Sequence, residues 1–210
     1  MRRLATRSRV RSALVAGAAA LGVALTTGAP ASAWTADVVA NVDVTTTIKK
    51  LNQTTTYPRG SFVGVLDSDK RTIVGMLSLP AGTTRLKIGS LPLADVTTKI
   101  TQVGPSTTSI SFDDWDWVLR TTQTTTVQIV SIKPVGLNLN LVGNYCKTAP
   151  FTQTLDGRFH TTGTGPGTSY DYWMTGTYTL PRFANCGLAT PIINLAIPGA
   201  GNTVKAHFTR

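Results

Sequence analysis

The 210-residue chain contains no glutamate, two cysteines, two histidines and few aromatic residues, which make up 7% of its length. Its ten acidic residues are therefore all aspartates. Because glutamate favours helices and aspartate does not, this composition argues against a helical protein. Threonine, which favours strands, is instead frequent and occurs in clusters such as Thr45–Thr47, Thr54–Thr56 and Thr124–Thr126. The composition alone predicts a β-rich fold.

Motifs of several enzyme classes are also missing. The chain has no Gly-x-Ser-x-Gly nucleophile elbow and no glycine-rich phosphate loop between a strand and a helix. His160 lies close to Asp156 in the sequence, but no motif places a serine or a free cysteine beside it as a nucleophile. We therefore assign no catalytic residue and no cofactor. A non-catalytic protein is favoured, and a secreted hydrolase that acts on glycans is kept as an alternative.

The N-terminal segment has the three zones of a secretory signal peptide. An arginine-rich stretch without acids comes first, an apolar run follows from Ala13 to Leu25, and Ala31-Ser32-Ala33 forms a cleavage box of small residues. The apolar run is shorter than the ~20 residues that cross a bilayer. We expect residues 1–33 to be removed and residues 34–210 to form a single secreted domain, with no membrane span.

The charge of the mature chain is modestly positive. The sequence carries 20 Lys and Arg against 10 Asp, and 5 of these cations lie in the signal segment, which leaves a net charge of +5. The remaining cations are scattered along the sequence, as at Lys49-Lys50, Lys70-Arg71 and Arg85. Because they form no continuous basic run, nucleic-acid binding is not expected.

Cys146 and Cys186 are the only cysteines of the chain. In a protein bound for an oxidising compartment, such a pair predicts a disulfide bond. Closing a loop of about forty residues would stabilise the fold by roughly 4 kcal/mol. A metal site would need further ligands, and the sequence offers no Cys-x-x-Cys or His-rich spacing to provide them.

Alternation of apolar and polar residues recurs along the mature chain. Val38, Val42 and Val44 fall on one face of an extended segment that continues to Ile48. Two apolar runs on either side of the polar turn at residues 67–71 predict a hairpin. The dipeptide Asp156-Gly157, which tolerates the left-handed backbone of a tight turn, predicts another hairpin.

Further strands are predicted from the same alternation at residues 96–103, 109–112, 127–133, 137–141 and 202–209. Strands spaced in this way, without helical periods between them, are typical of an all-β fold. We predict an antiparallel β-sandwich, with a β-barrel as the alternative.

One short helix is expected near residues 190–198. Thr190 suits the N-cap position, Pro191 suits the first helical position, and Pro198-Gly199 ends the segment. A helix of about two turns is too short to be stable alone, so we expect it to pack on the sheet.

Several motifs in the last third of the chain resemble those of one group of proteins. They are Asn144–Thr148, Gly176–Phe183, Asn185-Cys186-Gly187 and Pro198–Thr203, with a looser match at Leu77–Pro80 and Val103–Pro105. Together they resemble a group of uncharacterised exported proteins of actinobacteria. The resemblance implies an exported protein and carries over no catalytic residue.

Four aromatic residues are the candidate ligand-binding residues. Trp115 and Trp117 form one pair, and Tyr172 and Trp173 form the other. Rings exposed side by side could stack on a sugar. Packing between strands would instead return them to the core of the protein.

Three carboxylates beside the tryptophans are the candidate metal ligands. Asp113, Asp114 and Asp116 could donate oxygens to Ca²⁺. The segment lacks the glycine and the spaced ligands of a helix-loop-helix calcium site, and a solvated loop is the alternative interpretation.

These observations predict a secreted or cell-envelope-associated module without catalytic activity. Its partner is not specified by the sequence, and a glycan or a lipid of the cell envelope is the class we consider. An apolar-ligand or lipid carrier with a β-barrel cavity is the alternative, because a long alternating chain can close around apolar side chains. The volume of an internal cavity distinguishes the two.

Overall fold

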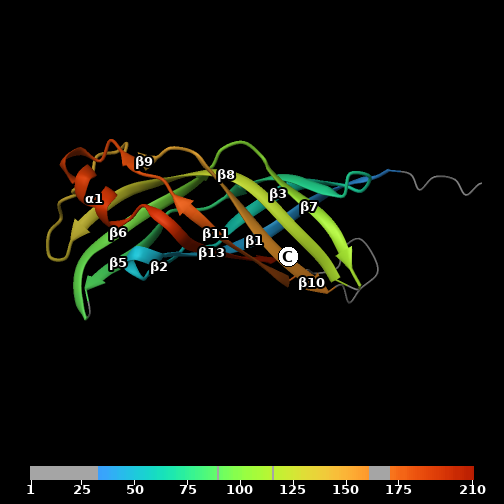
Figure 1. The fold of residues 1–210 in the computed structure, drawn as a ribbon, viewed down its shortest axis with the longest axis horizontal. Coiled ribbons are helices and arrows are strands. Elements are labelled where there is room, and N and C mark those ends of the chain that lie inside the picture. The colour runs from blue at the N-terminus through green and yellow to red at the C-terminus, as the bar shows by residue number, and fades with distance from the viewer. Residues whose placement is uncertain (1–32, 89, 115, 161–170) are drawn as a thin grey trace, which may run out of the picture. The chain divides into compact units, whose positions relative to one another are not determined.

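The computed structural model describes residues 33–210 apart from residues 89, 115 and 161–170. The alternating segment at the start of this region forms strand β1 (Thr35–Ile48). Ala40, Val42 and Val44 are buried on one face of β1, as the alternation predicts. Within the described residues, β1 is followed by twelve further strands and one short α-helix, and Figure 1 shows their arrangement.

The strands after β1 fall into two groups along the chain. The first group comprises β2 (Gln53–Thr56), β3 (Gly60–Asp67), β4 (Thr72–Ser78), β5 (Gly82–Ile88), β6 (Leu91–Gln102), β7 (Ser106–Asp113) and β8 (Asp116–Pro134). The second group comprises β9 (Lys147–Thr148), β10 (Phe151–His160), β11 (Asp171–Leu180), β12 (Phe183–Ala184) and β13 (Gly199–Thr209). The helical segments are the single turns η1 (Lys49–Leu51) and η2 (Gly187–Ala189) and the helix α1 (Thr190–Ala196).

Antiparallel pairing links eight strands in a closed circuit, in the order β10, β11, β13, β1, β3, β4, β7 and β8. Strand β8 closes this circuit because it pairs with β7 along one edge and with β10 along the other. Thr121 of β8, for example, lies opposite Thr108 of β7 and opposite Leu155 of β10. The long strands β1 and β8 are therefore on opposite sides of the circuit.

The sheet continues beyond the circuit at one end, which we call the α1 end. There β6 pairs with the second half of β8, β5 pairs with β6, and β2 pairs with the last residues of β1. Figure 1 shows α1 and β9 gathered at the same end of the strands as β5 and β6. The result is an antiparallel, sandwich-like fold, as predicted, and not a clear barrel.

Strands β2 and β5 face each other at the α1 end without a ladder of main-chain pairing between their residues. Side chains connect them instead. The Thr84 hydroxyl donates to the Thr54 carbonyl (3.0 Å), and the Gln53 amide donates to the Thr84 hydroxyl (3.2 Å). We call this junction the β2–β5 seam.

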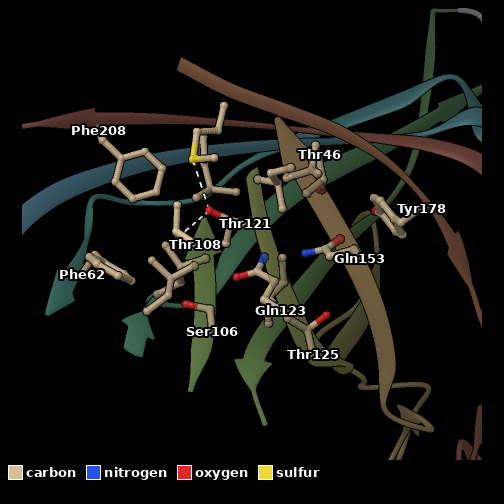
Figure 2. Close-up of a pocket in the computed structure, with 18 of the residues that line it drawn as sticks. Thr46, Phe62, Ser106, Thr108, Thr121, Gln123, Thr125, Gln153, Tyr178 and Phe208 are labelled. Carbon is tan, nitrogen blue, oxygen red and sulfur yellow. Dashed lines mark hydrogen bonds between the residues drawn. The ribbon is translucent and has the colours of Figure 1, made fainter. Parts of the chain in front are cut away.

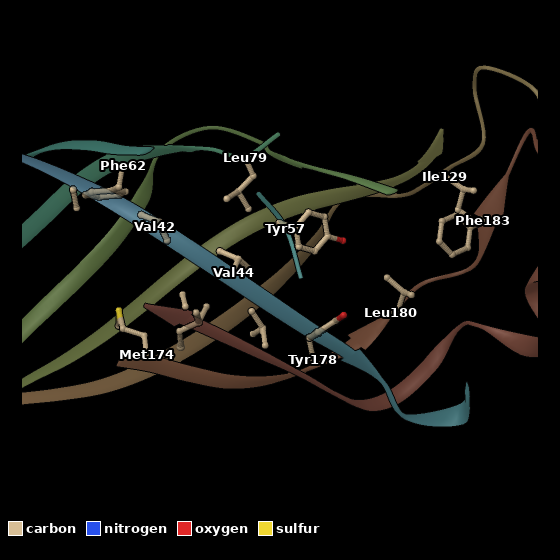
Figure 3. Packing of buried hydrophobic residues seen from close by; sticks show 14 of the residues in the cluster. Val42, Val44, Tyr57, Phe62, Leu79, Ile129, Met174, Tyr178, Leu180 and Phe183 are labelled. Atoms are coloured by element: carbon tan, nitrogen blue, oxygen red, sulfur yellow. The ribbon is translucent and has the colours of Figure 1, made fainter. Parts of the chain in front are cut away.

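The apolar core runs through the space between the opposed strands (Figure 3). Val42 and Val44 of β1 face it from one side, and Leu119 and Ile129 of β8 face it from the other. Near the α1 end, Ile193 is the buried residue of the helix. The helix predicted near residues 190–198 is therefore present, and it packs on the sheet as expected.

The hairpin predicted at Asp156-Gly157 is wrong. Strand β10 continues through both residues, which pair with β8 on one side and with β11 on the other. A Cβ atom at Gly157 would lie 2.7 Å from the carbonyl oxygen of Trp173. The glycine thus permits the close approach of β11 rather than a turn.

The strand predicted at residues 137–141 is also wrong, since this segment has no regular structure. The side chain of Asn140 takes the place of strand pairing. Its carbonyl accepts the N–H of Ile132 (3.0 Å), and its amide donates to the carbonyl of Val130 (3.2 Å). The segment lies along β8 through these bonds, while Leu137 and Leu139 remain exposed.

Within the described ranges of the chain, no helix is long and apolar enough to span a membrane.

Candidate functional site

The most developed site is an apolar cavity of about 270 Å³ at the α1 end. Its wall combines residues that are far apart in the sequence. Aliphatic and aromatic side chains dominate it, and among them are Ile48 of β1, Leu86 of β5, Val96 of β6, Ile129 of β8, Leu180 of β11 and Ile193 of α1. It is therefore an interior surface that no single segment defines.

Short bonds fix the C-terminal wall of this cavity. The side chain of Asn194 in α1 accepts the N–H of Phe183 (2.7 Å) and donates to the carbonyl of Phe183 (2.9 Å). The predicted disulfide between Cys146 and Cys186 is present, and both cysteines are fully buried. It ties η2 and α1 to the segment that precedes β9, so the helix is held over the cavity.

Among the described residues, no charged side chain lines the cavity. The phenol of Tyr57 forms a 2.9 Å hydrogen bond with the Thr98 hydroxyl, and burial raises the pKa of Tyr57 above its usual value. Burial also raises the pKa of Tyr178. Both phenols therefore stay neutral at ordinary pH, and the cavity presents hydrocarbon with a few neutral hydroxyl and amide groups.

A smaller pocket of about 50 Å³ lies deeper, inside the strand circuit (Figure 2). Its wall includes Thr46 and Tyr178, which also line the apolar cavity, so the two spaces are neighbours. Gln123, Thr125 and Gln153 contribute polar groups to it. The Thr125 hydroxyl is buried and has no hydrogen-bond partner among the described residues. Such a group favours an uncharged hydrogen-bonding guest.

The three predicted aromatic residues that the structure describes, Trp117, Tyr172 and Trp173, do not form one exposed surface. Trp117 stacks on Phe159 (5.6 Å between ring centroids), and Phe159 stacks on Tyr172 (5.1 Å). Trp173 is on the other face of β11, with 54% of its surface exposed, and stacks on His207. Trp117 and Tyr172 are thus part of a cross-strand stack.

Trp115 lies outside the described residues, so its predicted role is not addressed by the structure. The side chain of His160 is likewise outside them. Asp156, which lies four residues before His160 in the sequence, is 3.6 Å from Arg120, measured between the carboxylate oxygen and the guanidinium nitrogen.

The three aspartates considered as metal ligands lie at the turn between β7, which ends at Asp113, and β8, which begins at Asp116. Asp113 forms an ion pair with Arg158, and Asp116 lies 3.7 Å from the same guanidinium group. Asp114 has a left-handed backbone (φ 54°), which aspartate tolerates in tight turns. Over the part of the chain that the structure covers, no three His, Cys, Asp or Glu side chains are grouped closely enough to hold a metal ion.

Sequence reasoning did not identify the cavity residues. Their contributions come from both ends of the chain and from β8, and only the folded sheet brings them together. One signal was available: the predicted helix is apolar on more than one face, since Ile192, Ile193 and Leu195 are close in sequence. A short helix of this kind has more apolar surface than one side of a sheet can cover.

No protein-family model, no curated protein and no solved structure matches this chain.

Proposed function

We propose that this protein binds a small, uncharged apolar molecule in the cavity at the α1 end, as a non-catalytic carrier or receptor. The observation that carries the proposal is the 270 Å³ cavity with its uncharged, mainly hydrocarbon wall. Among the functions considered from the sequence, this favours the apolar-ligand carrier. The proposal includes export from the cell, which the N-terminal sequence predicts and with which the buried disulfide agrees.

The size of the cavity limits the ligand. A dry apolar cavity of about 150 Å³ is sufficient for benzene, and sites for drug-sized ligands begin at about 300 Å³. A volume of about 270 Å³ therefore suits a single alkyl chain of moderate length or a small fused-ring system. Each buried methylene contributes about 0.8 kcal/mol to the binding of such a molecule.

The deeper pocket adds a preference for the end group of the ligand. Gln123, Gln153 and Thr125 can donate to or accept from a hydroxyl or carbonyl group, and the described lining of the pocket contains no cation to neutralise a carboxylate. An ionised carboxylate would lose its hydration there without a charged partner. The ligand is therefore an alcohol, ester or hydrocarbon rather than a free fatty acid.

A glycan-binding module is less well supported. Such a site would need exposed, neighbouring rings, whereas Trp117 and Tyr172 stack within the fold and Trp173 faces away from them. Among the described members of the predicted set, Trp117, Tyr172 and Trp173, no pair of neighbouring exposed rings is present for a sugar.

The proposal is tested with N-phenyl-1-naphthylamine, an uncharged dye that fluoresces in apolar surroundings, and with n-alcohols as competitors. We expect saturable binding, and competition that improves about fourfold per added methylene until the cavity is filled. The matching fatty acids should compete less well at neutral pH. Saturating dye should also raise the melting temperature, because it binds only the folded protein.

Two variants distinguish the cavity from the outer surface. Ala196 lines the cavity, so Ala196→Phe should fill it and weaken dye binding at least tenfold (about 1.4 kcal/mol). Ala184 is exposed and does not line it, so Ala184→Phe should bind as the wild type does. Equal binding by both variants, or no saturable binding by the wild type, would refute the proposal.

A further inference from the structure

The α1 end has an apolar outer surface that no described residue covers. Leu188, Ile192 and Leu195 of η2 and α1 are 99%, 72% and 81% exposed, respectively. Leu137 and Leu139 of the segment that follows β8 are exposed as well. We call these five residues the leucine face. Large aliphatic residues exposed at one end of a molecule can form a contact surface, and the charge around them helps to decide the partner.

Three exposed cations lie on segments that neighbour α1. Lys50 lies against Gly199, just after α1, with its Cε atom 3.1 Å from the position of a Cβ at that glycine. Arg182 lies immediately before β12, and Asn194 of α1 forms a hydrogen bond with Phe183 of that strand. Lys147 lies in β9, which pairs with β12. All three cations are exposed.

Charge is divided unequally between the two ends of the molecule. The segments that build the α1 end, residues 49–51, 82–102, 125–148 and 182–198, carry eight Lys or Arg and a single Asp. That aspartate, Asp95, forms an ion pair with Arg85 (2.7 Å). The other nine aspartates lie in the rest of the described chain. The α1 end is thus strongly basic although the mature chain is only modestly so.

The cavity reaches the surface beside this face. Ile192 and Leu141 both line the cavity and are exposed to solvent. An apolar ligand that enters or leaves the cavity between Ile192 and Leu141 would pass between aliphatic side chains rather than through water.

From these features we infer that the α1 end docks on the surface of an anionic lipid bilayer. The leucine face would insert among the acyl chains at the headgroup boundary, while the surrounding lysines and arginines contact the phosphates. A soluble polyanion would match the cations but leave the leucines exposed, whereas a bilayer matches both. The inference concerns the outer surface and does not depend on which ligand fills the cavity.

The charge component is tested with mature protein and vesicles of phosphatidylglycerol or phosphatidylcholine in a flotation assay. We expect binding to phosphatidylglycerol that weakens with added salt, and little binding to phosphatidylcholine. The triple change Lys50→Gln, Lys147→Gln and Arg182→Gln should weaken partitioning about a hundredfold. The control Arg71→Gln, Lys205→Gln and Arg210→Gln removes the same charge outside this end and should leave binding within about threefold of the wild type.

The apolar component is tested with Ile192→Ser together with Leu195→Ser. Both residues are exposed, so the fold should persist, which circular dichroism checks, and binding to phosphatidylglycerol should fall at least tenfold. The control, Val63→Ser with Val65→Ser, alters exposed residues on β3 and should have no such effect. Equal binding by the two serine pairs would overturn the inference. So would binding to phosphatidylglycerol vesicles that the charge variant loses and the serine pair at α1 keeps, since the surface would then recognise anionic charge alone.

Discussion

Two buried phenol groups make the stability of this protein sensitive to alkaline pH. Tyr57 and Tyr178 are both buried in the core, and burial raises the pKa of each. In the unfolded chain they would ionise near the usual pKa of about 10. Above that pH the folded state retains protons that the unfolded state loses, so the free energy of unfolding falls as the pH rises.

We therefore predict that Tyr178→Phe reduces the loss of stability between pH 9 and pH 11 by about 1 kcal/mol. Urea unfolding at several pH values measures this. Tyr145 is exposed, so Tyr145→Phe should follow the wild-type curve and serves as the control. A Tyr178→Phe curve parallel to the wild type would contradict the prediction.

Single residues show clearly where local sequence rules succeed and fail. Alternation places Val42 and Val44 in the core correctly, because the strand period alone decides which face they occupy. The rule for Asp-Gly turns fails at Gly157, where the approach of β11 and not a turn requires the glycine. The approach of a distant strand cannot be inferred from the dipeptide itself.

Among the contacts between elements, the disulfide that ties the segment of η2 and α1 to the loop before β9 has the largest expected effect on the free energy of unfolding. The disulfide joins Cys146 and Cys186 across a sequence separation of 40 residues. The double variant Cys146→Ala and Cys186→Ala should lose about 4 kcal/mol of unfolding free energy. Because α1 is then less firmly held over the cavity, dye affinity should also fall at a temperature where the variant is still folded.

Urea unfolding and dye titration measure the two effects of this change. Wild-type protein treated with a reducing agent should reproduce them, which separates the loss of the covalent bond from the loss of two sulfur atoms. Unchanged stability in both samples would show that the bond adds little to the fold.

The elements were predictable to different degrees. The helix near residues 190–198 had start and stop signals within the sequence and is found there, but Ala189 and not Thr190 takes the N-cap position. The segment at 137–141 alternates like a strand, but two bonds from the Asn140 side chain and one main-chain bond, from the Leu141 N–H to the Ile132 carbonyl, take the place of a strand ladder with β8. Alternation thus indicates which residues are apolar without showing whether a partner strand is present.

At the scale of the whole molecule, the candidate site depends on long-range pairing. The circuit closes because β8 pairs with β10, and the cavity wall combines β1, β5, β6, β8, β11 and α1. From the sequence we predicted an antiparallel sandwich, with Trp115, Trp117, Tyr172 and Trp173 as the candidate ligand-binding residues. The cavity itself could not be located, since no local motif encodes which strands become neighbours.

The β2–β5 seam leads to a prediction about dynamics. The amide protons of the facing edges of β2 and β5 should exchange with solvent much faster than those of Val42 or Val44 in β1, which is paired along both edges. Hydrogen exchange followed by mass spectrometry or NMR measures this difference. Saturating dye should slow exchange at the seam. Exchange at β2 and β5 that is as slow as in β1 would show that the seam is closed.

Gln53 and Thr84 border both the seam and the cavity. Parting the two strands breaks these two side-chain hydrogen bonds and the neighbouring bond between Tyr57 and Thr98, while every main-chain ladder of the sheet stays intact. Under the proposed function, the seam would be a second route to the cavity, besides the opening at Ile192 and Leu141, and a guest molecule that used it would cross without global unfolding. Residence time would then be tuned by the residue at position 84, independently of how stable the protein is.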